Sequence, residues 1–156
     1  MSVGLNWILL GLLAPLLLAA SWTDIRAREI PNGLNLAIAL LALPFWWASG
    51  LALWPDVALQ IGVATLVFAI FALAFAFGMM GGGDVKMLGA LALWLPWESV
   101  LALLVIMSLA GGVLTLAMML RKRLARAEGQ IEIPYGVAIA FAGIWLISER
   151  FLYQFG

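Results

Sequence analysis

Long apolar runs separated by short polar clusters are the main pattern of the sequence. Helices that cross a bilayer need about 20 apolar residues, because the hydrocarbon core is roughly 30 Å thick and a helix rises 1.5 Å per residue. Most of the runs are close to this length. The predicted membrane helices cover residues 5–22, 34–48, 57–77, 85–95, 99–120 and 134–148.

The composition agrees with this pattern. Hydrophobic residues make up 66% of the chain and charged residues 10%, whereas a soluble domain carries about a quarter charged residues. We therefore expect an all-α, polytopic membrane protein with a single membrane-embedded domain over residues 1–156. The N-terminus has no basic residue before its first apolar run, so a removable signal peptide is not expected.

The basic residues orient the predicted helices. The loops after the first, third and fifth runs hold seven of the eight basic residues. These are Arg26, Arg28, Lys86, Arg121, Lys122, Arg123 and Arg126. The positive-inside rule places such loops in the cytoplasm, which leaves both termini outside. The cluster at residues 121–126 is also suited to contact anionic lipid.

Charge and missing residue types exclude several classes of function. The net charge is zero, which leaves no basic surface for nucleic acid. The chain has no cysteine and no histidine, which excludes disulfides, thiolate nucleophiles, imidazole bases and the usual zinc sites. Carboxylates, Lys, Arg, Tyr and hydroxyl groups remain. No cofactor and no metal is expected.

Two aspartates are the strongest candidates for chemistry. Asp24 ends the first apolar run and Asp84 precedes the fourth, so the alternating topology brings both to the same face of the membrane. The run at 85–95 is too short to cross a full bilayer, so Asp84 is recessed, and a carboxylate at such depth usually has a function or a partner. Two facing carboxylates can share a proton, one acting as base on a water and the other as acid. This pair could hydrolyse a peptide bond.

The segment around Asp84 adds a second feature. Gly81, Gly82 and Gly83 carry no side chain, so an extended substrate could approach their backbone closely. Two interpretations of Lys86 remain open: its ammonium reaches the lipid headgroups, or it favours the ionised form of Asp84. Asn32, after Ile30-Pro31, is expected to cap the second helix.

These residues resemble a known family. The segment Gly81-Gly82-Gly83-Asp84-Val85-Lys86 is similar to the GxGD signature of intramembrane aspartyl proteases, in the GxGDxK form of type IV prepilin peptidases. Asp24 followed by Ile30-Pro31-Asn32 resembles that family's first aspartate region. Ile133-Pro134-Tyr135-Gly136 resembles the start of its last span. The likeness covers nearly the whole chain.

The resemblance implies both an activity and a location. Asp24 and Asp84 would be the catalytic pair of an endopeptidase in the bacterial cytoplasmic (inner) membrane, with the active site facing the cytoplasm. Its substrates would be prepilins or pseudopilins, which carry a basic leader before a hydrophobic helix. The chain looks like the short, peptidase-only class associated with Tad-type pili, since larger members carry a cysteine-containing segment. No N-methyltransferase activity is assigned.

Several further residues are candidates to face such a substrate. Glu128 and Glu132 could attract a basic leader, although solvated loop acids are the simpler interpretation. Pro134 and Tyr135 open the last predicted helix, where a proline is also a common helix-starting residue.

Two other functions fit part of the pattern. In a small ion- or proton-coupled transporter or channel component, the two aspartates would bind a cation and the glycines would mark a broken helix. That function does not explain why both acids lie at one face. In a non-enzymatic membrane anchor, both aspartates would be structural. The sequence does not fix the oligomeric state.

Overall fold

The computed structural model describes residues 3–125 and 133–155 and contains no strand within them. Its elements are α1 (Val3–Ala27), α2 (Asn32–Ala48), a short π-helical turn η1 (Leu53–Val57), α3 (Ala58–Ala76), α4 (Gly82–Ala92), α5 (Trp97–Ala125) and α6 (Tyr135–Phe155). The all-α fold expected from the sequence is confirmed, and each predicted run corresponds to one helix.

Three segments of the described chain are long and apolar enough to cross a membrane. They are α1 from Gly4, the continuous stretch Leu53–Ala76, and α5, while α2 is a shorter apolar helix. Large apolar side chains point outward along them, such as Leu73 and Leu116. A soluble surface rarely exposes so much contiguous apolar area. The structure therefore confirms a polytopic membrane protein.

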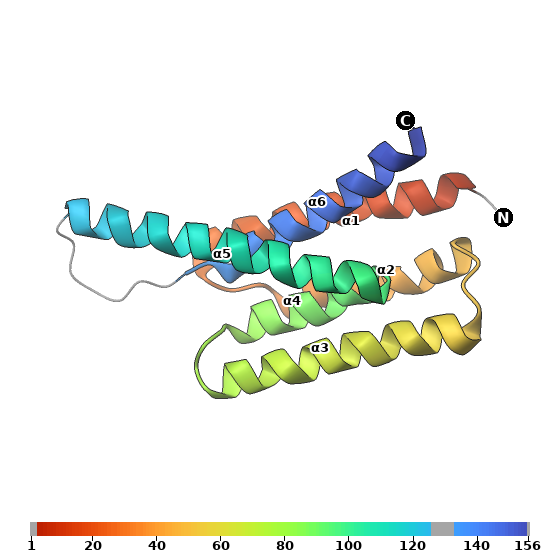
Figure 1. Ribbon diagram of the computed structural model, residues 1–156, viewed down its shortest axis with the longest axis horizontal. Coiled ribbons are helices and arrows are strands. Elements are labelled where there is room, and N and C mark those ends of the chain that lie inside the picture. Colours follow the sequence, from red (N-terminus) through yellow and green to blue (C-terminus); the bar gives the residue numbers. More distant parts are fainter. Residues whose placement is uncertain (1–2, 126–132, 156) are drawn as a thin grey trace.

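The short helix α4 lies at the centre of the bundle (Figure 1). It packs against α2, α3 and α6, while α1 packs against α2 and α6, and α5 packs mainly against α6. The C-terminal ends of α1, α3 and α5 lie toward one end of the bundle. The first and last described residues, in α1 and α6, lie at the other end (Figure 1).

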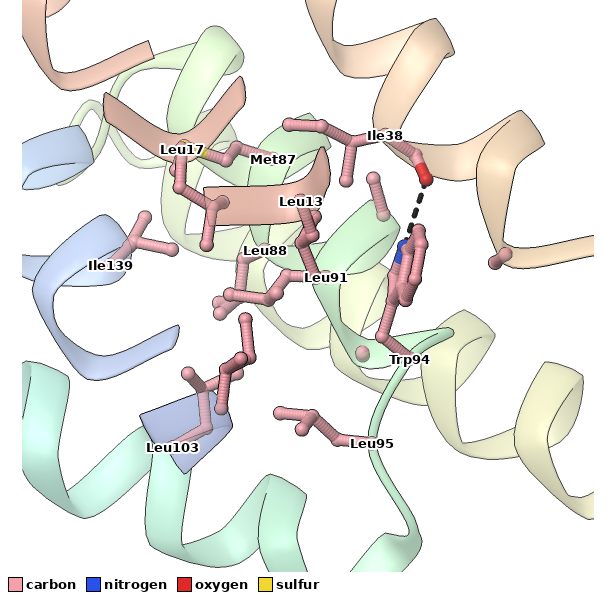
Figure 2. Close-up of a cluster of buried hydrophobic side chains, with 14 of the residues drawn as sticks. Leu13, Leu17, Ile38, Met87, Leu88, Leu91, Trp94, Leu95, Leu103 and Ile139 are labelled. Carbon is pink, nitrogen blue, oxygen red and sulfur yellow. Dashed lines mark hydrogen bonds between the residues drawn. The ribbon is translucent and has the colours of Figure 1, made fainter. Parts of the chain in front are cut away.

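Apolar side chains from five helices surround α4 and form the core. Leu13 and Leu17 of α1, Leu88 and Leu91 of α4, and Ile139 of α6 are almost fully buried and converge there (Figure 2). Burying such side chains among each other fixes how the helices pack, because close packing tolerates few alternative arrangements. The core therefore holds α1, α4 and α6 together.

The C-terminal end of α4 is fixed by side-chain hydrogen bonds. The Leu93 carbonyl accepts a hydrogen bond from Trp46 Nε1 at 2.8 Å and from Gln60 Nε2 at 2.9 Å. Trp94 Nε1 donates to the Ile38 carbonyl at 2.9 Å (Figure 2). The last carbonyls of a helix have no partner within it, so here α2 and α3 supply donors.

The helix bounds differ from the predicted runs where polar residues continue a helix. Helix α1 extends past residue 22 to Ala27, so Asp24 lies in its last turn and not at its end. Helix α4 begins at Gly82, so Asp84 lies in its first turn. The expected cap at Asn32 is wrong: Pro31 is the N-cap residue and no side chain caps α2. The Asn32 side chain instead accepts a hydrogen bond from Lys86.

Candidate active site

The last turn of α1 places Asp24. Arg28 adopts a left-handed conformation with φ 56°, and its N–H donates to the Asp24 carbonyl at 3.0 Å. A residue in this conformation ends a helix by capping a carbonyl of the last turn. The chain then turns back, and the buried Ile30 lies against Gly83 at the start of α4. The Asp24 side chain is only 5% exposed.

The first turn of α4 places Asp84. Gly81, in an extended conformation, is the N-cap residue, and no side chain caps the helix there. The Gly81 backbone N–H faces the Asp84 carboxylate, which is 6% exposed. The N–H groups at the start of a helix have no partner within it, so a carboxylate in the first turn can accept from them.

The two carboxylates lie together where α1, α4 and α6 meet. They are close enough to interact electrostatically, and the Gly136 backbone N–H faces both of them. The Val137 N–H also faces Asp24. Asp24 Oδ2 and Asp84 Oδ1 are buried without a hydrogen-bond partner among the described residues. Two residues distant in the sequence thus form one buried acidic pair.

Glycines form the walls of this site. A Cβ atom at position 136 would lie 2.7 Å from Asp24 Oδ2, and one at position 81 would lie 3.0 Å from Asp84 Oδ2. Real Cβ atoms essentially never come closer than 3.0 Å to such neighbours. Gly136 in particular is required by close approach: any side chain there would displace the Asp24 carboxylate.

Asn35 of α2 is a polar residue of the site that the sequence analysis did not single out. It is 5% exposed, and its Nδ2 donates to the Gly83 carbonyl at 3.2 Å. Its Oδ1 is buried and has no partner among the described residues. The signal was a lone amide inside an apolar run, which in a membrane helix marks a functional or packing contact.

The other predicted site residues fall in different places. Lys86 Nζ donates to Asn32 Oδ1 at 2.8 Å, so its ammonium is held by α2. Pro134 is buried and directly precedes α6, while the Tyr135 ring lies against Gly111 of α5. Their neighbour Gly136 is the residue of this segment that contacts the pair. Glu128 and Glu132 lie outside the described residues.

This arrangement suits acid–base chemistry on a water. Two adjacent carboxyl groups can share one proton, which leaves one as base and the other as acid. Among the residues that the structure describes, the pair belongs to no group of three or more His, Cys, Asp or Glu side chains that could hold a metal ion.

Curated relatives bear on the identity of the chain. It is 33% identical over 134 residues to a prepilin leader peptidase/N-methyltransferase of Stutzerimonas stutzeri, covering 81% of this chain and 44% of the relative. It is 28% identical over 141 residues to one of Aeromonas hydrophila, covering 86% and 47%. For one of Pectobacterium carotovorum subsp. carotovorum the identity is 27% over 155 residues, covering 93% and 54%.

The chain thus spans about half the length of the curated relatives that it matches. No solved structure gives a significant match. The sequence profile of the type IV leader peptidase family matches residues 11–116, a range that contains Asp24, Asn35 and Asp84. The chain belongs to the type IV leader peptidase family.

Proposed function

We propose that this chain is a membrane-embedded aspartyl endopeptidase that removes the leader peptide of prepilin-type substrates. The single observation that carries the proposal is the buried pair of Asp24 and Asp84, two carboxylates that face the same backbone N–H of Gly136. Family membership supplies the class of substrate, because the matched relatives are prepilin leader peptidases.

The pair would act through one activated water. The ionised carboxylate takes a proton from the water, whose oxygen attacks the scissile carbonyl, while the protonated carboxyl donates a hydrogen bond to the developing oxyanion. Collapse of the tetrahedral intermediate breaks the C–N bond as a carboxyl proton passes to the leaving amine. One water is consumed, a new carboxyl end and a new amino end form, and the shared proton remains on the pair.

We place the protein in the bacterial inner membrane with the pair toward the cytoplasm. The last turn of α1 holds Arg26, and Arg28 follows it. This segment and the start of α4, with Lys86, lie at the same end of the bundle as the pair. The basic residues at the end of α5 lie toward that end as well (Figure 1). Positive residues favour the cytoplasmic side.

Labelling of single cysteines would test this orientation, because the natural chain has none. Ala125→Cys lies at the end of α5, and Ala52→Cys lies before η1, and both positions are exposed. A maleimide that does not cross membranes should label Ala52→Cys in spheroplasts and Ala125→Cys only after lysis. The reverse pattern would contradict the orientation.

The activity is tested with purified protein in detergent and a prepilin-type substrate that carries its leader. Asp24→Asn and Asp84→Asn should each lower the cleavage rate at least about 1000-fold, since both carboxylates act as a unit. Asp56→Asn is the matched control: this exposed aspartate of η1 accepts a hydrogen bond from the Ala52 N–H, away from the pair. Cleavage that persists in either of the first two variants would sink the proposal.

A further inference from the structure

A groove between α2, α3 and α4 lies on the other side of α4 from the acidic pair and has no part in the mechanism above. It encloses about 510 Å³ and is open on one side. It runs from Asn32 and Lys86, near the start of α4, to Leu93 at the end of that helix. Its length therefore matches two turns of α4.

The groove changes from polar to apolar along its length. Asn32, Asn35 and Lys86 line the end near the glycine segment, while Ala39, Ala64 and Ala90 line the deeper part. Lys86 and Asn32 are hydrogen bonded to each other across the entrance. An occupant that fits this gradient has a polar, water-exposed end followed by an apolar segment that lies within the membrane.

The deeper part is shaped for a helix. Gly89 allows Phe68 of α3 to come close to α4, because a Cβ at position 89 would lie 3.2 Å from Phe68 Cβ. The alanines on all three helices give the groove a smooth surface. Small residues are the ones that let membrane helices approach closely and pack by van der Waals contact.

Asn35 points to a peptide as the occupant. This residue lines the groove and is 95% buried, and its Oδ1 has no partner among the described residues. A buried amide oxygen is costly without a donor, most of all at membrane depth. A substrate whose helix is unwound near the scissile bond has free backbone N–H groups there, and one of them can donate to Asn35 Oδ1.

The glycine segment connects the groove to the acidic pair. The groove residues of α4, such as Lys86 and Gly89, lie on the opposite face of that helix from Asp84, since each residue turns the helix by about 100°. Only the start of α4 separates the two faces, and Gly81 and Gly82 carry no side chain there. Asn35 Nδ2 holds the neighbouring Gly83 carbonyl at 3.2 Å. An extended chain can cross at this point when the exposed Phe75 ring, which lies against Gly82, moves aside.

We propose that the groove between α2, α3 and α4 receives the apolar helix of the substrate, and that Asn35 binds the extended segment between that helix and the scissile bond. This inference rests on the proposed function. The substrate helix enters from the membrane and ends at the polar entrance. The chain before it then crosses the glycines, which brings the bond to be cut to Asp24 and Asp84.

Disulfide crosslinking tests the proposal. Asp84→Asn, which should bind without cleaving, is combined with Ala39→Cys or Thr65→Cys, both of which line the groove. The substrate is a prepilin-type protein with one cysteine two turns into its apolar helix. Both variants should crosslink. Val113→Cys is the matched control, because it lines a second apolar groove of about 640 Å³ between α5 and α6.

The outcomes separate this inference from the proposed function. Crosslinking at Val113→Cys alone, or at none of the three positions, would overturn the groove proposal while cleavage by the unaltered protein upholds the activity. If the unaltered protein does not cleave the substrate, the proposed function fails and the groove proposal fails with it. Crosslinks between two copies of the enzyme at Ala39→Cys, in place of crosslinks to substrate, would identify a subunit contact and also overturn it.

A bulky side chain in the groove gives a kinetic test. Thr65→Trp should raise the KM for the intact substrate about tenfold or more, since the ring would fill space that the substrate helix needs. The KM for a soluble peptide that ends shortly after the scissile bond should not change. Leu66→Trp, which is exposed on α3 outside the groove, is the control. Equal effects of both variants would contradict the proposal.

Two variants of Asn35 distinguish binding from a structural role. At a pH where the introduced carboxyl is ionised, Asn35→Asp keeps an oxygen that can accept from the substrate but has no donor for the Gly83 carbonyl, and Asn35→Ala loses both. If the oxygen binds substrate, Asn35→Asp should retain at least about fivefold more kcat/KM than Asn35→Ala, on both intact substrate and peptide. Equal losses would show that only the bond to Gly83 matters.

Discussion

The two ends of α4 differ in whether their buried polar groups have hydrogen-bond partners. At the C-terminal end, the Leu93 carbonyl accepts two side-chain hydrogen bonds, and the Trp94 indole N–H is bonded to Ile38. The Trp94 ring also stacks on Phe45 at a centroid distance of 5.0 Å. At the N-terminal end, Asp84 Oδ1 is buried without a partner among the described residues, and so is Asp24 Oδ2 across from it.

If the proposed function holds, the end of α4 that stabilises the fold and the end that acts on substrate are separated along a helix of 11 residues. The membrane interior penalises polar groups without partners. At the C-terminal end the buried polar groups have hydrogen-bond partners, and these bonds anchor α4 to α2 and α3. At the N-terminal end, buried carboxylate oxygens lack such partners within the described part of the chain. Glycines line this end instead of space-filling side chains. Substitutions at the two ends should therefore affect different measurements.

The largest expected effect is on catalysis, at the N-terminal end. The double variant Asp24→Asn/Asp84→Asn should lose at least about 1000-fold in cleavage rate and fall no further than either single variant, because two groups that act as a unit are not additive. Its melting temperature should equal or exceed that of the unaltered protein, since two buried carboxylates are replaced by neutral amides of the same shape. A cleavage assay and thermal unfolding in detergent measure both. A large loss of stability would mean that the pair is structural.

The next largest effect is on stability, at the C-terminal end. Trp94→Ala should destabilise the protein by about 3–5 kcal/mol, because it removes a fully buried indole from the core. The fraction that remains folded should keep its cleavage rate. Trp47→Ala is the control, since this side chain is 77% exposed and should change the free energy of unfolding little. Loss of activity in folded Trp94→Ala would contradict the idea that the C-terminal end of α4 affects stability and not catalysis.

The fold was predictable from the sequence because the apolar runs that indicate the helices are long and recur along the chain. Each apolar run became a helix, and basic residues marked one end of the bundle. The bounds were less predictable. The residues after Trp22 are polar and read as a loop, but Thr23 Oγ1 donates to the Ala20 carbonyl and α1 continues through Asp24. The spacing of apolar residues does not show where a helix ends when its last turn is polar.

The buried acidic pair and its surroundings were predictable only in part, for a related physical reason. Asp24 and Asp84 stood out because the alternating topology brings both to the same face of the membrane and because Asp84 precedes a run too short to cross a full bilayer. Gly136 did not stand out as a site residue, although its segment did, because its role depends on a distance to Asp24 that only the fold creates. Asn35 was overlooked because one amide within a run of apolar residues does not alter the helix prediction.

Two glycines make close contacts of different kinds: Gly136 with a carboxylate of the acidic pair, and Gly143 with apolar side chains. Substitution of the first should have a smaller effect on catalysis than loss of the pair, and substitution of the second should have none. Gly136→Ala should lower the cleavage rate about 10- to 100-fold, since its Cβ would meet Asp24 Oδ2 at 2.7 Å and overpacking at that distance moves the carboxylate by an amount worth about 1–3 kcal/mol. Gly143→Ala meets Leu91 Cδ2 at 2.8 Å, so it should lower the melting temperature and spare activity. Gly33→Ala meets nothing within 4 Å and is the control. Similar activity losses in all three would show that the contacts around Asp24 are not special.

The smallest effect concerns the shared acceptor at the end of α4. Trp46→Phe and Gln60→Leu each remove one donor from the Leu93 carbonyl but leave the other. The lost hydrogen bond should cost about 0.6 kcal/mol in each variant, the typical value within a membrane protein, and Trp46→Phe should cost more because it also removes buried volume. The double variant should cost more than the sum, because the carbonyl then has no side-chain donor and coupled partners are not additive. A double-mutant cycle by unfolding in detergent measures this coupling. Strict additivity would mean that the two bonds act independently and that losing both donors adds no further cost at the Leu93 carbonyl.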